Sequence, residues 1–191
     1  MEHLKRCGWC NLKNPLYISY HDNEWGKQNF TDAHLYAMLI LESFQAGLSW
    51  ECVLNKREAF YEAYDGFDID AVCCYGEEKV ASLLENKGII RNKRKILASI
   101  ENSRVFKKIL EEYGSFYAYL CTFSGGEILY ETDKTTNPLS DALSGDLMAR
   151  GMRFVGSTII YAYLQAVGMI VSHERDCFLY KKEKENDNGK K

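Results

Sequence analysis

The stretch LLENKGIIRNKRK, residues 83–95, predicts two helices joined by a tight hairpin. The first helix covers residues 77–87, Gly88 supplies its left-handed stop, and Asn92 caps the second helix. The free backbone N–H groups at the start of that second helix are suited to hold a phosphate. This stretch therefore predicts a helical domain with a phosphate-binding turn.

Positive charge is concentrated in the hairpin, although the whole chain has a formal net charge of −3. The basic residues there are Arg91, Lys93, Arg94 and Lys95. A charge run on a helix is most often a solvated face. Beside a phosphate-binding turn, however, the same run favours contact with nucleic acid, which the overall charge does not indicate.

Apolar residues recur at helical spacing through the rest of the chain, which predicts an all-α fold. One helix starts at Asp32, and a second runs from a Ser49 cap through Tyr61 toward Gly66. Residues 124–138 are predicted to form a polar loop. The other helix boundaries are predicted at Asn92 and Gly114, at Ser140 and Gly151, and at Ser157 and Gly168.

Length and composition indicate one domain over residues 1–180 and a charged, disordered tail at 181–191. The chain has 191 residues, 46% of them hydrophobic, without an apolar run that could span a membrane. Its N-terminus lacks the apolar segment of a secretory signal, so we expect a cytoplasmic protein. We also expect a monomer. The 7 cysteines follow no regular framework, which indicates reduced thiols.

Two Cys/His pairs near opposite ends of the chain make a possible ligand set for a soft metal. They are Cys7 with His21 and His173 with Cys177. Two thiolates and two imidazoles would fill the tetrahedral shell of a structural zinc ion. His173 and Cys177 share a helical face at this spacing, whereas only folding can bring Cys7 to His21. Spacing alone leaves ordinary core or surface positions equally open.

Glu42 continues the apolar stripe of Leu35, Met38 and Leu39, so helical geometry points its carboxylate toward the core. An unpaired buried carboxylate is costly, so Glu42 needs partners or a function. The alternative is a partly exposed glutamate that bonds a backbone group near the helix end. The run QAGLSW at residues 45–50 follows directly and predicts a break that could enter a partner.

Aromatic residues are dense in the N-terminal part of the chain. They are Trp9, Tyr17, Tyr20, Trp25 and Trp50. Such residues usually belong to the core. Around an inward carboxylate they could instead form a box that stacks on a flat cationic ring.

Four stretches closely resemble the bacterial 3-methyladenine DNA glycosylase I family. They are HDNEWG at 21–26, LESFQAGLSW at 41–50, GIIRNKRKI at 88–96 and RGMRFVGSTIIYAYLQAVGM at 150–169. The resemblance runs from about residue 7 to residue 178. It implies the all-helical fold of the helix-hairpin-helix DNA glycosylase superfamily and a structural zinc. The ligands implied by residue matching are Cys7, His21, His173 and Cys177.

The resemblance also implies a base pocket. Glu42 matches the residue that recognises the base, Trp50 the stacking ring, and Tyr17, Tyr20 and Trp9 the pocket lining. A base methylated at N3 is positively charged and already a good leaving group, so the enzyme need only flip it, hold it and stabilise the sugar cation. The implied substrate is alkylated double-stranded DNA, and the product is free 3-methyladenine.

Residues 92–126 contain no Asp, although many helix-hairpin-helix glycosylases place a water-activating Asp after the hairpin, and no nucleophilic lysine is evident. We therefore predict a monofunctional enzyme that leaves an abasic site and does not cut the strand. Gln45 and Leu48 are hypothesised to fill the gap left by the flipped nucleotide. The full set of expected DNA contacts is Gln45, Gly47, Leu48, Gly88, Arg91, Lys93 and Arg94.

Two alternatives stay open from the sequence. Cys10 forms a C-x-x-C unit with Cys7, so either cysteine could ligate zinc, and a redox role for the pair would need a βαβ context that is not evident. The whole chain could also be a zinc-stabilised DNA- or nucleotide-binding module without turnover. Such a module would bind alkylated or abasic DNA and release no base.

Overall fold

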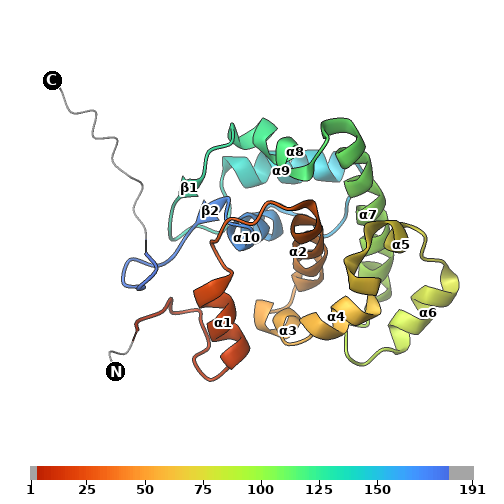
Figure 1. The fold of residues 1–191 in the computed structure, drawn as a ribbon, viewed down its shortest axis with the longest axis horizontal. Helices are drawn as coiled ribbons and strands as arrows, with labels where there is room; N and C mark the ends of the chain where they lie inside the picture. The colour runs from red at the N-terminus through yellow and green to blue at the C-terminus, as the bar shows by residue number, and fades with distance from the viewer. Residues whose placement is uncertain (1–3, 181–191) are drawn as a thin grey trace.

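The computed structural model describes residues 4–180 (Figure 1). The elements are α1 (Pro15–Asn23), α2 (Asp32–Gln45), α3 (Trp50–Leu54), α4 (Arg57–Ala63), the 3-10 helix η1 (Asp65–Phe67), α5 (Ile69–Cys73), α6 (Glu77–Glu85), α7 (Lys93–Tyr113), α8 (Phe116–Ser124), β1 (Leu129–Tyr130), α9 (Pro138–Ala149), α10 (Ser157–Ala166) and β2 (Ile170–Val171). The predicted all-α class is confirmed, with a minimal two-stranded sheet added. The predicted tail at 181–191 lies outside the described residues.

Helix α2 is the central element of the fold (Figure 1). All of residues 35–44 are buried, because α3, α7, α8 and α10 pack around the helix. A helix that is apolar on every side is expected in the interior of a domain. Glu42 interrupts this apolar surface and is buried with it.

The predicted helix-hairpin-helix is formed by α6 and α7. Asn92 caps α7 by accepting a hydrogen bond from the Lys95 N–H, and Gly114 ends the helix in the left-handed conformation, as predicted. The left-handed stop predicted at Gly88 is wrong, since Gly88 is not among the glycines with positive φ. Glycine is required there for close packing, because a Cβ on Gly88 would lie 2.9 Å from the Cβ of Ala59.

The helix predicted from Ser49 toward Gly66 is in fact divided. Ser49 caps α3 as expected, but the chain turns at Lys56 and starts α4 at the next residue. Lys56 Nζ donates hydrogen bonds to the carbonyls of Lys87 and Gly88, which fixes this turn against the hairpin. The turn also buries the Phe60 ring in the core.

The starts of the two later helices also differ from the prediction. Asn137 caps α9, and Ser140 is the third helical residue, whose side chain completes a capping box. Gly156 rather than Ser157 precedes α10 as its cap. The predicted helix ends at Gly151 and Gly168 are confirmed, because both glycines have positive φ.

The segment predicted as a polar loop at residues 124–138 contains β1, which pairs in parallel with β2 through Leu129 and Ile170. Two residues per strand are too few to show the alternation of a strand in the sequence. The pairing places residues 131–135 beside α10.

All 7 cysteines are free, in line with the predicted reduced thiols. Within residues 4–180, no helix has the length and apolarity needed to cross a bilayer.

Candidate active site and metal centre

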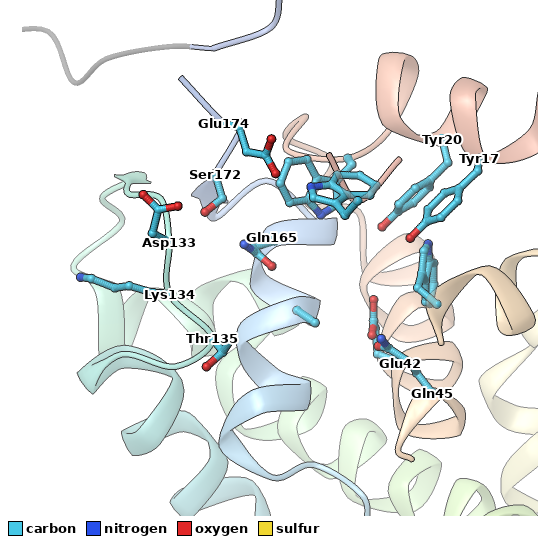
Figure 2. Close-up of a pocket in the computed structure, with 14 residues that line it drawn as sticks. Tyr17, Tyr20, Glu42, Gln45, Asp133, Lys134, Thr135, Gln165, Ser172 and Glu174 are labelled. Atoms are coloured by element: carbon cyan, nitrogen blue, oxygen red, sulfur yellow. The ribbon is translucent and has the colours of Figure 1, made fainter. Parts of the chain in front are cut away.

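A cavity of about 370 Å³ opens beside the C-terminal end of α2 (Figure 2). Its walls include Glu42 and Gln45 together with every ring predicted for the base pocket: Trp9, Tyr17, Tyr20, Trp25 and Trp50. The volume lies in the range of small-molecule sites, and the aromatic rings share the lining with polar side chains that could orient a ligand. Folding therefore brings together all six residues predicted to contact the base.

Glu42 lies in the wall of this cavity, near the hydroxyl ends of Tyr17 and Tyr20 (Figure 2). The side chain is 2% exposed, and its Oε2 atom has no hydrogen-bond partner within residues 4–180. Burial raises the pKa of this carboxyl well above its ordinary value. The alternative of an exposed glutamate at the helix end is thereby excluded. A cation in the cavity would favour the charged carboxylate.

The rings form a continuous aromatic wall. Tyr20 and Trp50 have centroids 5.3 Å apart, and Tyr17 lies 5.5 Å from Trp9. Burial raises the pKa of Tyr17 to about 12, so its hydroxyl stays neutral and can donate a hydrogen bond. The buried Trp50 Nε1–H has no acceptor within residues 4–180. The wall therefore offers electron-rich ring faces and hydrogen-bond donors next to the acid.

The opposite wall comes from residues that the sequence analysis did not find. Figure 2 shows Thr135 and Gln165 across the cavity from Glu42. Lys134 also lines this side, but its ammonium forms an ion pair with the Glu131 carboxylate, with Nζ and Oε2 2.6 Å apart. Lys134 and Thr135 follow β1, whose pairing with β2 carries no signal in the sequence, whereas Gln165 reaches the site from α10, which packs against α2.

The predicted metal ligands are also brought together, in a buried cluster. Cys7, His21, His173 and Cys177 offer ligand atoms that all lie within 4.8 Å of one another. The Cys7 Sγ–His173 Nδ1 and Cys177 Sγ–His21 Nε2 distances are both 3.5 Å. A tetrahedral zinc with ordinary bond lengths to sulfur and nitrogen would separate such atoms by roughly 3.5 Å. The cluster could therefore hold a metal ion of this kind.

Groups around the cluster orient its ligands. His21 directs Nε2 to the cluster and donates from Nδ1 to Asp22 at 2.7 Å, as metal-bound histidines commonly do. The Arg6 guanidinium holds Asp22 and keeps the pKa of that carboxyl below its ordinary value. Burial raises the pKa of the Cys7 thiol to about 12, so its thiolate needs a cation beside it.

The structure distinguishes between the two cysteines of the C-x-x-C unit. Cys7 belongs to the cluster, whereas the Cys10 thiol points to the backbone carbonyl of Tyr17 at 3.8 Å. Cys10 is therefore not one of the grouped ligands.

Trp9 and Trp25 belong to both the pocket and the surroundings of the metal cluster. Trp9 lies 5.2 Å from the His21 ring and 4.7 Å from Trp25, measured between centroids. Trp25 in turn lies 4.7 Å from the His173 ring with an edge contact. The pocket and the metal cluster thus share a wall.

The residues predicted to contact DNA fall into two groups, one on the hairpin between α6 and α7 and one on the break after α2. Arg91, Lys93 and Arg94 are exposed, and within residues 4–180 no carboxylate pairs with them. Lys95, expected to add to this charge, is instead buried, with 6% of its surface exposed. A lysine in the first turn of α7 turns inward because acceptors on α2 face it there.

The break after α2 separates the two residues predicted to fill the gap in DNA. Gly47 adopts a left-handed conformation with φ of 76°, and Leu48 beyond it is 43% exposed. Gln45 lies in the pocket wall near Glu42, with its Oε1 atom buried (Figure 2). Leu48 is therefore the better placed of the two to enter a duplex.

A helix-hairpin-helix with unpaired basic residues, together with an aromatic pocket that holds a buried acid, defines the class of helix-hairpin-helix DNA glycosylases. Such enzymes flip the damaged base into a pocket of this kind.

Comparison with known proteins agrees with this class. The methyladenine glycosylase family matches residues 9–180 of this chain. DNA-3-methyladenine glycosylase 1 of Escherichia coli (strain K12) is 39% identical over an alignment of 184 residues that covers 93% of this chain and 97% of the relative. A crystal structure of 3-methyladenine DNA glycosylase I has a TM-score of 0.86 at 40% identity and covers 93% of this chain and 100% of its own.

A third similar protein is 3-methyladenine DNA glycosylase I from Staphylococcus aureus, whose structure was determined to explain 3-methyladenine recognition. It has a TM-score of 0.88 at 29% identity and covers 94% of this chain and 98% of its own. The chain belongs to the methyladenine glycosylase family and is a DNA glycosylase.

Proposed function

We propose that this protein is a monofunctional glycosylase that flips N3-methyladenine out of alkylated double-stranded DNA, hydrolyses its N-glycosidic bond and leaves an abasic site. The observation that carries this proposal is the Glu42 carboxyl, which is buried, unpartnered at Oε2 and set among aromatic rings. Such an acid is costly unless a cationic ligand repays its burial. The similar proteins are named for 3-methyladenine, which is such a base.

Charge discrimination follows from this pocket. A purine methylated at N3 carries a positive charge in DNA, so it gains the attraction of Glu42 and of the ring faces of Trp50 and Tyr20. Neutral adenine gains no attraction to the carboxylate and leaves the base stack less readily. Selection therefore occurs both when the base leaves the duplex and when it binds in the pocket.

The chemical step needs little acid catalysis, because departure of the base neutralises its own charge. The pocket holds the base while the sugar acquires positive charge, and water attacks the sugar. Glu42 lines the cavity, as do Asp133 and Glu174, and its buried carboxylate can stabilise this charge. The absence of Asp from residues 92–126 supports a mechanism without a dedicated water-activating Asp in that segment.

We infer that the metal is zinc and that its role is structural. Two sulfur and two nitrogen ligands complete a tetrahedral shell and leave no position for a substrate. When bound, zinc would neutralise the two buried thiolates. Cys7 and His21 would then be tied to His173 and Cys177, which joins the N-terminal segment to the C-terminal one.

The proposed domain covers residues 1–180 and acts as a monomer.

Release of 3-methyladenine from methylated duplex DNA, followed by chromatography, tests the function directly. We expect Glu42→Ala and Trp50→Phe to lower this release while zinc content stays that of the wild type. Glu62→Ala is a matched control, since Glu62 is an exposed glutamate on α4 without a role in the pocket. Wild-type release by both pocket variants would show that these residues are not the base site.

The same assay separates the enzyme from the alternative of a binding module without turnover. A module would bind alkylated or abasic DNA and release no base. The buried acid favours the enzyme, because a protein without turnover has no need to keep an unpartnered carboxyl in its core.

A further inference from the structure

Lys95 joins the DNA-facing hairpin to the last turn of the helix that carries Glu42. It is the third residue of α7, and its Nζ donates hydrogen bonds to the carbonyls of Phe44 at 2.8 Å and Ala46 at 2.6 Å. The neighbouring basic residues of the hairpin stay exposed. Lys95 is therefore not a phosphate contact like its neighbours, and its charge is directed to the interior.

This position is unfavourable for a cation unless hydrogen-bond acceptors compensate for the burial of its charge. The first turn of a helix carries partial positive charge, and burial lowers the pKa of Lys95. Helix α2 supplies the compensation, because its C-terminal carbonyls carry partial negative charge and its last turn has no basic residue of its own. Lys95 thus caps α2 from a different helix.

The capped carbonyls lie directly before the break that carries Leu48. Ala46 follows the last residue of α2 with a non-helical ψ of 115°, and Gly47 then turns the chain through a positive φ. The Leu48 N–H closes this turn by donating to the Gln45 carbonyl at 2.6 Å. On its other side, the Lys95 ammonium lies 5.8 Å from the centre of the Phe154 ring. One buried ammonium therefore fixes the geometry from which Leu48 projects.

We propose that Lys95 is a positioning residue for base flipping, which couples docking of the hairpin on the phosphate backbone to insertion of Leu48 into the duplex. This inference rests on the proposed function, in which Leu48 occupies the space left by the base. Arg91 and Arg94 hold the hairpin on the backbone, and Lys95, the next residue in the first turn of α7, transmits that constraint to the end of α2. The ammonium then sets where the break meets the base stack, without contacting DNA or the base itself.

The experiment measures single-turnover release of 3-methyladenine from methylated duplex DNA at saturating enzyme, so that affinity for DNA does not enter the rate. We expect Lys95→Met to lower this rate about 10- to 100-fold, the effect of a small misplacement near a reacting centre. Leu48→Ala should lower it similarly. Because Lys95 acts through Leu48, the double variant should be no slower than the slower single variant.

A spectroscopic signal reports insertion independently of chemistry. In a duplex with an abasic-site analogue and a neighbouring 2-aminopurine, wild-type protein should raise the fluorescence when Leu48 disturbs the stack. Lys95→Met and Leu48→Ala should both lose most of this rise. Lys95→Arg, which keeps a buried cation at the same carbonyls, should recover part of the signal and of the rate.

Two controls separate positioning from folding and from charge. Lys108→Met removes an exposed lysine from the same helix and should keep the wild-type rate. Binding of free 3-methyladenine, followed by fluorescence of the pocket tryptophans, should stay within about twofold of wild type for Lys95→Met, since the pocket itself is intact.

The inference is overturned by a wild-type rate in Lys95→Met, by additive losses in the double variant, or by a parallel loss of free-base binding, which would mean a collapsed pocket. If the wild-type protein releases no base, the proposed function fails as well. If the wild type releases base and Lys95→Met matches it, the coupling alone fails.

Discussion

Glu42→Gln should change activity and stability in opposite directions. The substitution keeps the shape of the side chain and its ability to form hydrogen bonds but removes the charge. Glutamine can still contact the base, so the difference from wild type isolates the electrostatic contribution of the buried carboxylate.

The expected loss of activity follows from the attraction between the carboxylate and the cationic base. At about 4 Å and an effective dielectric constant of about 20, two unit charges attract by about 4 kcal/mol. Part of this is offset, because Glu42 must first lose its proton in a site that raises its pKa. We expect about 3 kcal/mol to remain, which lowers kcat/KM for 3-methyladenine release by about a hundredfold.

The expected gain in stability has a definite pH dependence. The pKa of Glu42 in the folded protein is raised well above its ordinary value of 4.5. The stabilising contribution of such an acid is fully present below its unfolded pKa and is lost as pH rises through the folded pKa. Across that window the wild type loses about 1.4 kcal/mol per pH unit relative to Glu42→Gln, or about 3–5 °C in Tm.

Thermal melts of the wild type and of Glu42→Gln at about pH 5, 6, 7 and 8 measure this difference. Steps of about one pH unit are enough to follow how the difference in stability changes with pH. The metal site is the same in both proteins, so its own pH dependence cancels in the comparison. Glu62→Gln should follow the wild type in both assays, because Glu62 is exposed. A Tm difference that is constant with pH, or unchanged base release, would refute the reasoning.

Three further predictions concern the metal, the hairpin and one glycine. Cys177→Ser should abolish zinc binding and lower Tm by about 10 °C, as measured by metal analysis and thermal melts, whereas Cys52→Ser should keep the metal. Arg94→Met should reduce the slope of log Kd against log salt concentration for duplex DNA by about 0.9, and an unchanged slope would mean that Arg94 contacts no phosphate. Gly168→Ala should destabilise the fold by about 3 kcal/mol or more in denaturant titrations, because φ is 80° and a Cβ would lie 2.5 Å from the Lys27 carbonyl carbon; a neutral change would contradict this packing.

The inward direction of Glu42 could be predicted because Glu42 shares a helical face with Leu35, although the structure buries all of residues 35–44 and not that face alone. The spacing from Leu35 to Glu42 fixes which residues share a face, and burial of that face then follows from its composition. The cap at Asn92 and the stop at Gly114 are local in the same sense. Features that depend on a few neighbouring residues are therefore present in the sequence itself.

The second wall of the pocket and the role of Lys95 could not be predicted in this way. Thr135 follows a strand of only two residues, too short for a periodic pattern, and Gln165 reaches the cavity through the packing of α10 against α2. Lys95 lies in a run of exposed basic residues, and only the end of α2 across from it explains why this member turns inward. Gly88 is similar, since its need for glycine comes from Ala59 on another helix.

The shared wall of pocket and metal cluster gives the proposed zinc a consequence for base recognition. Trp9 and Trp25 line the cavity, and each also contacts the ring of a proposed metal ligand, His21 or His173. An ion that fixes those imidazoles would also fix the two indoles, although it contacts no substrate. Base stacking depends on ring orientation, so loss of the metal should weaken the pocket as well as the fold. The zinc would then stabilise the fold through its four ligands, and it would affect base binding through the two indole rings packed against those ligands.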